Sequence, residues 1–165
     1  MPSYQHTVLF ITLLFSGLIA GLLYSYSCSV NPGLKALSDT EYLKAMQSIN
    51  RAIQNPYFFA CFMGLLLLFP LTSWSLYQQH LTPSFYFMLI AAALYFIGVF
   101  GITVIGNVPL NDQLDRFVIS TSSSEDIAAM RQIFEMPWNL FHLVRTVSAM
   151  LSFGFTILAL FKYKL

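Results

Sequence analysis

The chain has 165 residues, of which 57% are hydrophobic, 16% aromatic and only 9% charged, with a formal net charge of +1. Soluble domains carry roughly 25% charged residues, so this composition excludes a water-soluble globular domain and predicts an integral membrane protein. The small net charge and the lack of a basic run also exclude nucleic acid as a partner. We expect a multi-pass protein whose main partner is the lipid bilayer, located in the plasma membrane or, in a bacterium, the inner membrane.

Four stretches are long enough to cross the hydrocarbon core of a bilayer, which takes about 20 apolar residues in a helix. Helices satisfy their own backbone hydrogen bonds in lipid, so the pattern predicts one all-α domain over residues 1–165, an integral membrane four-helix bundle. Both termini then lie on one face with the short turn 78–84. The two long connections lie on the opposite face, which we call the mouth. The predicted spans are residues 7–26, 57–77, 85–105 and 138–161.

Two features of the first span concern its possible cleavage as a signal peptide and its packing against other helices. Ser25 and Ser27 precede Cys28 in the manner of a signal-peptide cleavage site. However, the segment lacks a basic n-region, and its apolar run exceeds the roughly 7–15 residues of a typical h-region, so we expect an uncleaved span. Gly17, Gly21, Ser25 and Cys28 form a stripe of small residues, which predicts close helix packing inside the bundle.

The first long connection carries its own helix signals. Ser38 followed by Glu41 forms a capping box, and Asn55-Pro56 ends the helical pattern and starts the next span. We expect this helix to lie flat on the mouth. Its apolar residues recur at helical spacing and are Tyr42, Met46, Ile49 and Ile53.

The second long connection predicts two helical pieces. It begins with a turn around Pro109, after which Asn111 can cap a short helix. A Ser-rich run over residues 120–124 restarts a helix with Glu125 in its first turn, as the helix dipole favours. Pro137 then either kinks this helix into the fourth span or restarts it there.

The few charges are distributed unevenly. Twelve of the fifteen lie in the two long connections, Lys162 and Lys164 end the chain, and Arg145 alone stands within a span. The mouth holds five Lys and Arg residues and the terminal face two, which by the positive-inside rule places the mouth in the cytoplasm. Since Lys162 and Lys164 flank their span directly, the orientation stays open.

Arg145 is the first candidate for a functional residue. Trp138, His142 and Arg145 recur at steps of three and four, so they share one helix face, with Arg145 about 10 Å beyond Trp138 along the axis. A guanidinium at that depth is costly unless it is paired or reaches water, and such residues mark functional sites. The alternative is a structural pin that ties loop carboxylates or carbonyls to the bundle.

His142 allows two interpretations. Because like charges disfavour the imidazolium, a histidine beside Arg145 tends to be neutral. A neutral imidazole could serve as a base. Alternatively, His142 is a hydrogen-bonded packing residue.

Polar side chains also converge on the mouth. Amides near a membrane boundary often cap helices, and this explains Asn31, Asn55 and Asn111 without any function. The remaining concentration still points to this end of the bundle. The polar set comprises Asn31, Gln47, Asn50, Asn55, Asn107, Asn111 and Asp112.

The sequence offers no pattern for a metal or a haem. His6 and His80 belong to the terminal face, whereas His142 belongs to the mouth, so a site using two histidines with His142 would have to reach across the bilayer. Cys28 and Cys61 fit no metal-binding or redox spacing. We therefore predict no metal and no cofactor.

Several blocks of sequence extend over nearly the whole chain and are distinctive as a set. They are residues 24–34 (YSYSCSVNPGL), 41–42 (EY), 46–50 (MQSIN), 55–56 (NP), 106–111 (GNVPLN) with Leu114, and Trp138 with Arg145-Thr146. These blocks, in this order, resemble the membrane family that contains the anthrone oxygenases, much of which is catalogued as a domain of unknown function.

The resemblance implies a four-helix membrane protein and, for the named members, oxygenation of anthrone-type polyketides to anthraquinones by dioxygen without metal, flavin or haem. For this chain we hypothesise that His142 removes an acidic benzylic proton and that Arg145 stabilises the resulting enolate oxygen. The substrate would be an apolar aromatic molecule, anthrone-like or quinol-like. The predicted substrate-binding residues are Asn107, Asn111, Trp138, Asn50 and Asn31.

A second function stays open. The chain could be a non-enzymatic membrane module that binds a lipid or quinone-like molecule or supports a partner protein, with Arg145 and the amides pinning the loops over the bundle. A transporter or channel is disfavoured because one intramembrane charge provides no relay. The sequence also leaves open whether the chain forms a homo-oligomer.

Overall fold

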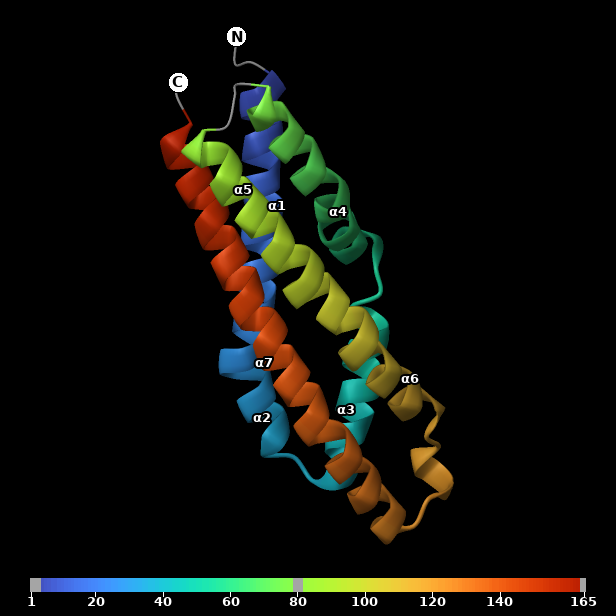
Figure 1. Ribbon diagram of the computed structural model, residues 1–165. Helices are drawn as coiled ribbons and strands as arrows, with labels where there is room; N and C mark the ends of the chain where they lie inside the picture. The colour runs from blue at the N-terminus through green and yellow to red at the C-terminus, as the bar shows by residue number, and fades with distance from the viewer. Residues whose placement is uncertain (1–3, 79–81, 164–165) are drawn as a thin grey trace.

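The computed structural model describes residues 4–78 and 82–163, and every regular element among these residues is a helix, which confirms the predicted fold class. Figure 1 shows a lengthwise bundle with both chain ends at the same end. Four helical segments are long and apolar enough to cross a membrane, again as predicted. These segments are Tyr4–Lys35, Pro56–Tyr77, Pro83–Arg116 and Ser124–Lys162.

Two of the four spans are composite. The first and third spans contain π-helical segments, in which the backbone bonds from residue i to i+5 and the helix locally holds an extra residue. The first span consists of α1 (Tyr4–Ser25), η1 (Tyr26–Val30) and α2 (Asn31–Lys35), and the third of α5 (Pro83–Ala93), η2 (Leu94–Gly101), η3 (Thr103–Asn107) and α6 (Val108–Arg116). The remaining elements are α3 (Asp39–Ala52), α4 (Pro56–Tyr77), the 3-10 turn η4 (Ile119–Thr121) and α7 (Ser124–Lys162).

The spans differ in length, and the parts of the longer spans that extend beyond α4 form the mouth. α4 has 22 residues and is about 33 Å long, close to the thickness of the hydrocarbon core. The other three spans have 32, 34 and 39 residues, and Figure 1 shows that they extend past the start of α4 at the mouth end. There they meet α3. We call this part, formed by α2, α3, α6 and the first turns of α7, the mouth section.

Local capping signals set several helix starts as predicted. The side chain of Ser38 accepts a hydrogen bond from the Glu41 backbone N–H, and the Glu41 carboxylate bonds back to the Ser38 backbone. Asn55 caps α4, whose first residue is Pro56. In the second connection, α7 starts with a capping box and then continues through Pro137 without interruption.

The predicted flat orientation of α3 is wrong. Asp39 pairs with Arg131 of α7 at 2.9 Å, and Tyr42 contacts the ring of Phe134. The second contact lies three residues after the first on both helices. The two helices therefore run side by side in the same direction. This arrangement buries the apolar face of α3 against α7 instead of leaving it at the lipid interface.

Two further expectations are corrected. Asn111 lies inside α6, which starts at Val108, so it does not cap a helix. The small-residue stripe does not lie inside the bundle, because Gly21, Ser25 and Cys28 are exposed on the outer surface of the first span. Only Gly17 serves close packing: a Cβ atom there would lie 3.0 Å from Cε2 of Phe153.

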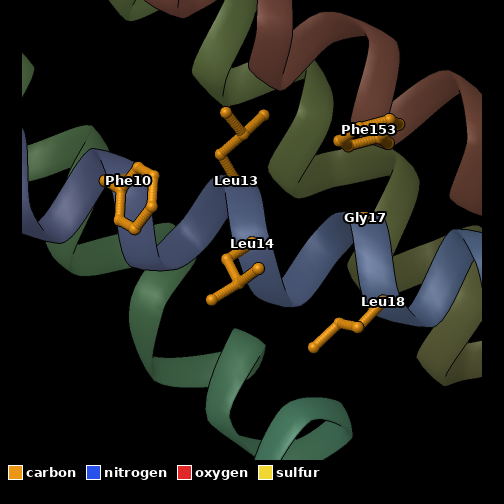
Figure 2. Close-up of a pocket in the computed structure, with 6 residues that line it drawn as sticks. All are labelled: Phe10, Leu13, Leu14, Gly17, Leu18 and Phe153. Atoms are coloured by element: carbon orange, nitrogen blue, oxygen red, sulfur yellow. The ribbon is translucent and has the colours of Figure 1, made fainter.

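Beside Gly17, the surfaces of α1 and α7 form an apolar groove of about 390 Å³. Figure 2 shows its walls, with Phe153 from α7 opposite the side chains of α1. In a bilayer this groove faces lipid tails. Its lining residues are Phe10, Leu13, Leu14, Gly17, Leu18 and Phe153.

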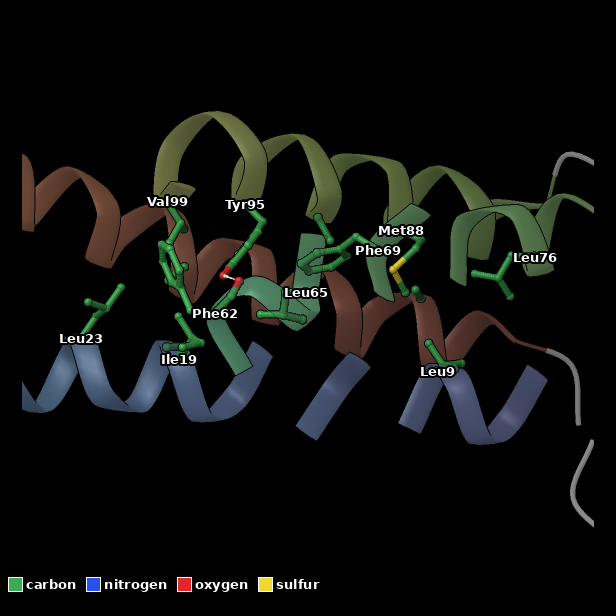
Figure 3. Close-up of a cluster of buried hydrophobic side chains, with 14 of the residues drawn as sticks. Leu9, Ile19, Leu23, Phe62, Leu65, Phe69, Leu76, Met88, Tyr95 and Val99 are labelled. Carbon is green, nitrogen blue, oxygen red and sulfur yellow. Dashed lines mark hydrogen bonds between the residues drawn. The ribbon is translucent and has the colours of Figure 1, made fainter. Parts of the chain in front are cut away.

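The buried apolar residues divide into two clusters. The membrane cluster fills the bundle between α1, α4, α5, η2 and α7, and Figure 3 shows its middle, where the Tyr95 hydroxyl donates to the Phe62 carbonyl at 2.7 Å. The mouth cluster lies in the mouth section and ends at Trp138, next to the polar site described below. Its buried members are Leu34, Tyr42, Leu43, Met46, Leu114, Ile127, Phe134 and Trp138.

Candidate functional site

The polar face of α7 lies in the bundle interior, as its spacing predicts. Trp138, His142 and Thr146 are each less than 5% exposed, and Arg145 is partly buried beside them. This face meets η1 on one side and η3 on the other. We call the group formed with Tyr26, Ser27 and Thr103 the His142–Arg145 site.

His142 has a partner on every side. Its Nε2 lies 2.9 Å from Ser27 Oγ, and its Nδ1 lies 3.3 Å from Arg145 Nε and 3.1 Å from Nη2. The imidazole stacks on Trp138 with ring centroids 5.1 Å apart and planes 11° apart, and Tyr26 contacts it at 5.1 Å. With 1% of its surface exposed, the ring is held in one orientation.

Arg145 bends back toward the mouth. Side chains of a helix point toward its N-terminus, and the guanidinium carbon lies 5.2 Å from the centroid of the Trp138 ring, two turns earlier in α7. This direction brings the charge closer to the polar mouth than the backbone of Arg145 itself, as expected for a snorkelling cation. Its Nη1 also reaches Thr103 Oγ1 of the third span, at 3.5 Å.

No acidic side chain of the described residues neutralises Arg145. The ion pairs among them join Arg51 with Asp115 and Arg131 with Asp39 and Glu135, all in the mouth section. The acceptors around Arg145 are a neutral imidazole nitrogen and a hydroxyl. A guanidinium has five N–H groups, and the bonds to His142 and Thr103 use three of them. Two N–H donors have no acceptor in the described part of the chain.

A close approach of η3 to α7 makes these contacts feasible. A Cβ atom at Gly106 would lie 2.6 Å from Cγ of Phe141, so only glycine lets the third span come this near. Thr103 is one turn earlier in the same π-helical segment and therefore reaches Arg145. On the other side, the π-helical η1 presents Tyr26 and Ser27 to His142. π-Helical turns recur at functional sites for this reason, since they redirect side chains.

Two of the predicted amides belong to the site. Asn111 Oδ1 accepts a hydrogen bond from Trp138 Nε1 at 2.7 Å, and Asn107 Nδ2 donates to the Trp138 carbonyl at 3.2 Å. Asn107 Oδ1 is buried and has no hydrogen-bond partner in the structure. The structure thus brings together Asn107, Asn111, Trp138, His142 and Arg145.

The structure does not bring the other two predicted residues into contact with His142 or Arg145. Asn50 is buried on α3, where its backbone carbonyl accepts from Gln54 and its Nδ2 has no hydrogen-bond partner. Asn31 begins α2 and is partly buried. Both lie in the mouth section, and their predicted role in substrate binding stays a prediction.

Sequence reasoning gave no role in the site to four residues, although three of them, Tyr26, Ser27 and Thr146, lie in the blocks that resemble the family. Thr146 follows His142 by one helical turn, so the helical spacing that identified His142 and Arg145 could have found it. Ser27 and Thr103 come from other spans, and no local pattern pairs them with α7. Tyr26 is one of nine tyrosines, and only its place in the block 24–34 pointed to it.

The described residues contain no group of three or more His, Cys, Asp or Glu side chains that could hold a metal ion. His6 packs against Tyr163 at the terminal end, with ring centroids 4.9 Å apart. His80 lies outside the described residues. The absence of a metal and of a cofactor stays a prediction.

A family model described as anthrone oxygenase matches residues 58–155, more than half of the chain. The chain belongs to the anthrone oxygenase family. The matched part contains Asn107, Asn111, Trp138, His142 and Arg145, whereas the contributions of the first span and of α3 lie outside it. No curated protein and no solved structure matches the chain.

Proposed function

We propose that this member of the anthrone oxygenase family oxygenates an apolar aromatic substrate, anthrone-like or quinol-like, with dioxygen and without a cofactor. The main support is Arg145, a guanidinium inside the bundle that has no acidic partner among the described residues and two N–H groups to spare. Beside it stands His142, a neutral nitrogen base in an aromatic surrounding. This pair suits a substrate that becomes an oxyanion when it loses a proton.

The proposed reaction begins with proton removal. His142 takes a proton from the benzylic carbon, and Arg145 stabilises the enolate oxygen that carries the resulting negative charge. The electron-rich carbon then reduces dioxygen and forms a carbon–oxygen bond, and the returning proton completes a hydroperoxide. Loss of water from the hydroperoxide leaves the new carbonyl of the quinone. One oxygen atom enters the product and the other leaves as water.

The aromatic and amide residues would position the substrate. Trp138, Tyr26 and His142 form a triangle of rings: the centroids of Trp138 and Tyr26 lie 5.4 Å apart, and each lies 5.1 Å from that of His142. The free Oδ1 of Asn107 can accept a hydrogen bond from a phenolic hydroxyl of the substrate. In this structure His142 is 1% exposed, so the substrate enters only after side chains move. Tyr26 is suited to this movement because its hydroxyl donates only to the sulfur of Met46, a weak acceptor.

Turnover of dithranol or emodin anthrone by the purified protein tests this function, with the uncatalysed autoxidation subtracted. Removing one oxyanion-stabilising donor costs about 10²–10³ in rate, so Arg145→Ala should lower turnover by about that factor. Arg116→Ala is the matched control because it removes an exposed cation in the mouth section and should retain full activity. A wild-type rate equal to the blank would refute the oxygenase function for this substrate class.

A non-enzymatic module is the competing function, and one contact favours it. Arg145 bonds both His142 on α7 and Thr103 on η3, so it ties two spans together. In that case Arg145→Ala should lower the melting temperature in detergent, while wild type and variant both leave the anthrone unchanged. Binding of the anthrone without turnover would support this function.

A further inference from the structure

The hydrogen bonds of the site determine which nitrogen of His142 carries the proton. A guanidinium has N–H donors and no acceptor. Two of these donors, on Nε and Nη2 of Arg145, point at Nδ1 of His142 at 3.3 and 3.1 Å. Nδ1 must therefore supply a lone pair, and the imidazole proton resides on Nε2.

The opposite side of the ring agrees with this assignment. With its proton on Nε2, His142 donates to Ser27 Oγ at 2.9 Å. The Ser27 hydroxyl can then donate to Thr146 Oγ1 at 3.2 Å, and Thr146 donates to the backbone carbonyl of His142 at 2.7 Å. The bonds therefore all run in one direction, from Nε2 of His142 through Ser27 and Thr146 to the His142 carbonyl, and each donor has an acceptor.

With this tautomer, His142 is not free to act as a base in the structure. The lone pair that would remove a substrate proton is the one that Arg145 occupies. Building on the proposed function, we propose that Arg145 is a removable cap on His142, and that the base is released only when an oxygen of the substrate draws the guanidinium away. One movement then does two things, because it frees Nδ1 and places the cation on the oxygen that becomes an oxyanion.

The geometry permits this exchange. The two bonds from Arg145 to Nδ1 share a single lone pair, and the bond to Thr103 is long at 3.5 Å. A carbonyl oxygen of the substrate can accept these N–H bonds in place of Nδ1, and the bond strengthens when that oxygen becomes an enolate, because it then joins two opposite charges. Arg145 is also only partly buried, whereas His142 is fixed between Trp138, Tyr26 and Ser27. The cap can therefore move while the base stays in place.

Ser27 and Thr146 act as positioning residues in this proposal. Since they occupy the Nε2 side, the ring cannot flip to escape Arg145 or to present Nε2 to the substrate. The cap has a protective consequence as well. Without substrate, the membrane-embedded base does not abstract protons from other molecules.

Nitrogen-15 NMR of labelled histidine tests the cap directly. The double variant His6→Asn/His80→Asn leaves His142 as the only imidazole of the chain, so both nitrogen signals come from one ring, and their couplings to the two ring C–H protons distinguish Nδ1 from Nε2. In the free protein at neutral pH we expect a protonated Nε2 and an unprotonated, hydrogen-bonded Nδ1. A protonated Nδ1, or an equal mixture of the two tautomers, would overturn the proposal.

The release step is tested with 1,8-dihydroxyanthraquinone, a coloured probe whose binding is followed by its absorbance. On binding we expect the Nδ1 signal to lose its hydrogen-bond shift or to become protonated, with Nε2 still protonated. A probe that binds without changing Nδ1, or that does not bind, would overturn the release.

Two variants separate the roles of the partners. Arg145→Met removes the cap, so the free protein should already show the Nδ1 signal of an unbonded nitrogen and no response to the probe. Ser27→Ala should change the Nε2 signal and leave Nδ1 capped, whereas Ser27→Thr should restore the wild-type Nε2 signal. A Nδ1 signal that is the same in Arg145→Met and wild type would contradict the cap.

These spectra do not depend on turnover. If the anthrone is not oxidised but the probe releases Nδ1, the proposed function fails and the cap stands as a feature of a binding site. If the anthrone is oxidised and Nδ1 is already free without ligand, the function stands and the cap fails.

Discussion

The membrane cluster and the His142–Arg145 site use polar side chains in opposite ways. Around the membrane cluster, hydroxyls bond mainly to backbone carbonyls: Ser84 donates to Ala159, Ser152 to Ala91 and Tyr95 to Phe62, at 2.7 to 2.8 Å. The hydroxyls of Thr12 and Thr72, 2.7 Å apart, are an exception. At the site, by contrast, side chains bond mainly to one another, as in the contacts of His142 with Ser27 and Arg145.

The difference has a physical consequence. When a hydroxyl donates to a backbone carbonyl of another span, its acceptor cannot move unless that helix unfolds. Such a bond therefore fixes the packing of the bundle. A side chain bonded to another side chain can exchange its partner for a ligand while the backbone stays in place. We therefore expect changes in the membrane cluster to affect stability, and changes at the site to affect chemistry.

The largest stability effect is expected from Phe69→Ala. Phe69 is fully buried in the membrane cluster, and the cavity left by a Phe→Ala change costs about 3–5 kcal/mol. Unfolding in detergent measures the loss, and the rate per folded molecule should stay at the wild-type value. Phe161→Ala is the control, since Phe161 is 78% exposed toward lipid. Equal losses for both variants would show that the membrane cluster is not the stabilising core.

Trp138→Phe should lower stability only a little and turnover more strongly, the reverse of Phe69→Ala. It retains an aromatic ring for His142 but removes the 2.7 Å bond to Asn111 Oδ1, which costs about 1 kcal/mol of stability. If the same bond holds the substrate-binding ring in place, turnover falls by about five- to tenfold. Trp74→Phe, on the lipid-facing surface of α4, should change neither quantity. A loss of stability with unchanged turnover would show that Trp138 contributes to packing and not to substrate binding.

The smallest effect is expected at the outer end of the mouth section. Hydrogen bonds from the side chain and the backbone of Ser38 hold the pKa of the exposed Glu41 carboxyl below its usual value of 4.5. A lowered pKa adds stability above the pKa of the unfolded chain, and this contribution disappears as the pH falls through the pKa of the folded protein.

Glu41→Gln should therefore be slightly less stable than wild type at neutral pH and equally stable in acid. Thermal unfolding at the two pH values measures the difference. Asp112→Asn, which removes an exposed carboxylate without a hydrogen bond to the described residues, should show no such convergence. A deficit of Glu41→Gln that persists in acid would contradict the capping role.

The sequence by itself determined the features that follow local rules. Runs of apolar residues specify the four spans because lipid excludes polar backbone, whatever the neighbouring helices do. The starts of α3 and α4 follow from Ser38 and Asn55, since a cap needs only residues three positions apart. Spacing along one helix likewise placed Trp138, His142 and Arg145 on a common face.

Only the tertiary structure decided what that face meets. The partners Ser27 and Thr103 come from spans more than 40 residues away in sequence, and no helical period connects them with α7. The orientation of α3 along α7 and the outward position of Gly21 depend on which neighbour buries more surface, not on the segments themselves. Arg145 is the clearest case: the sequence predicts a buried cation, and the fold determines that its acceptor is the base nitrogen of His142 rather than a carboxylate.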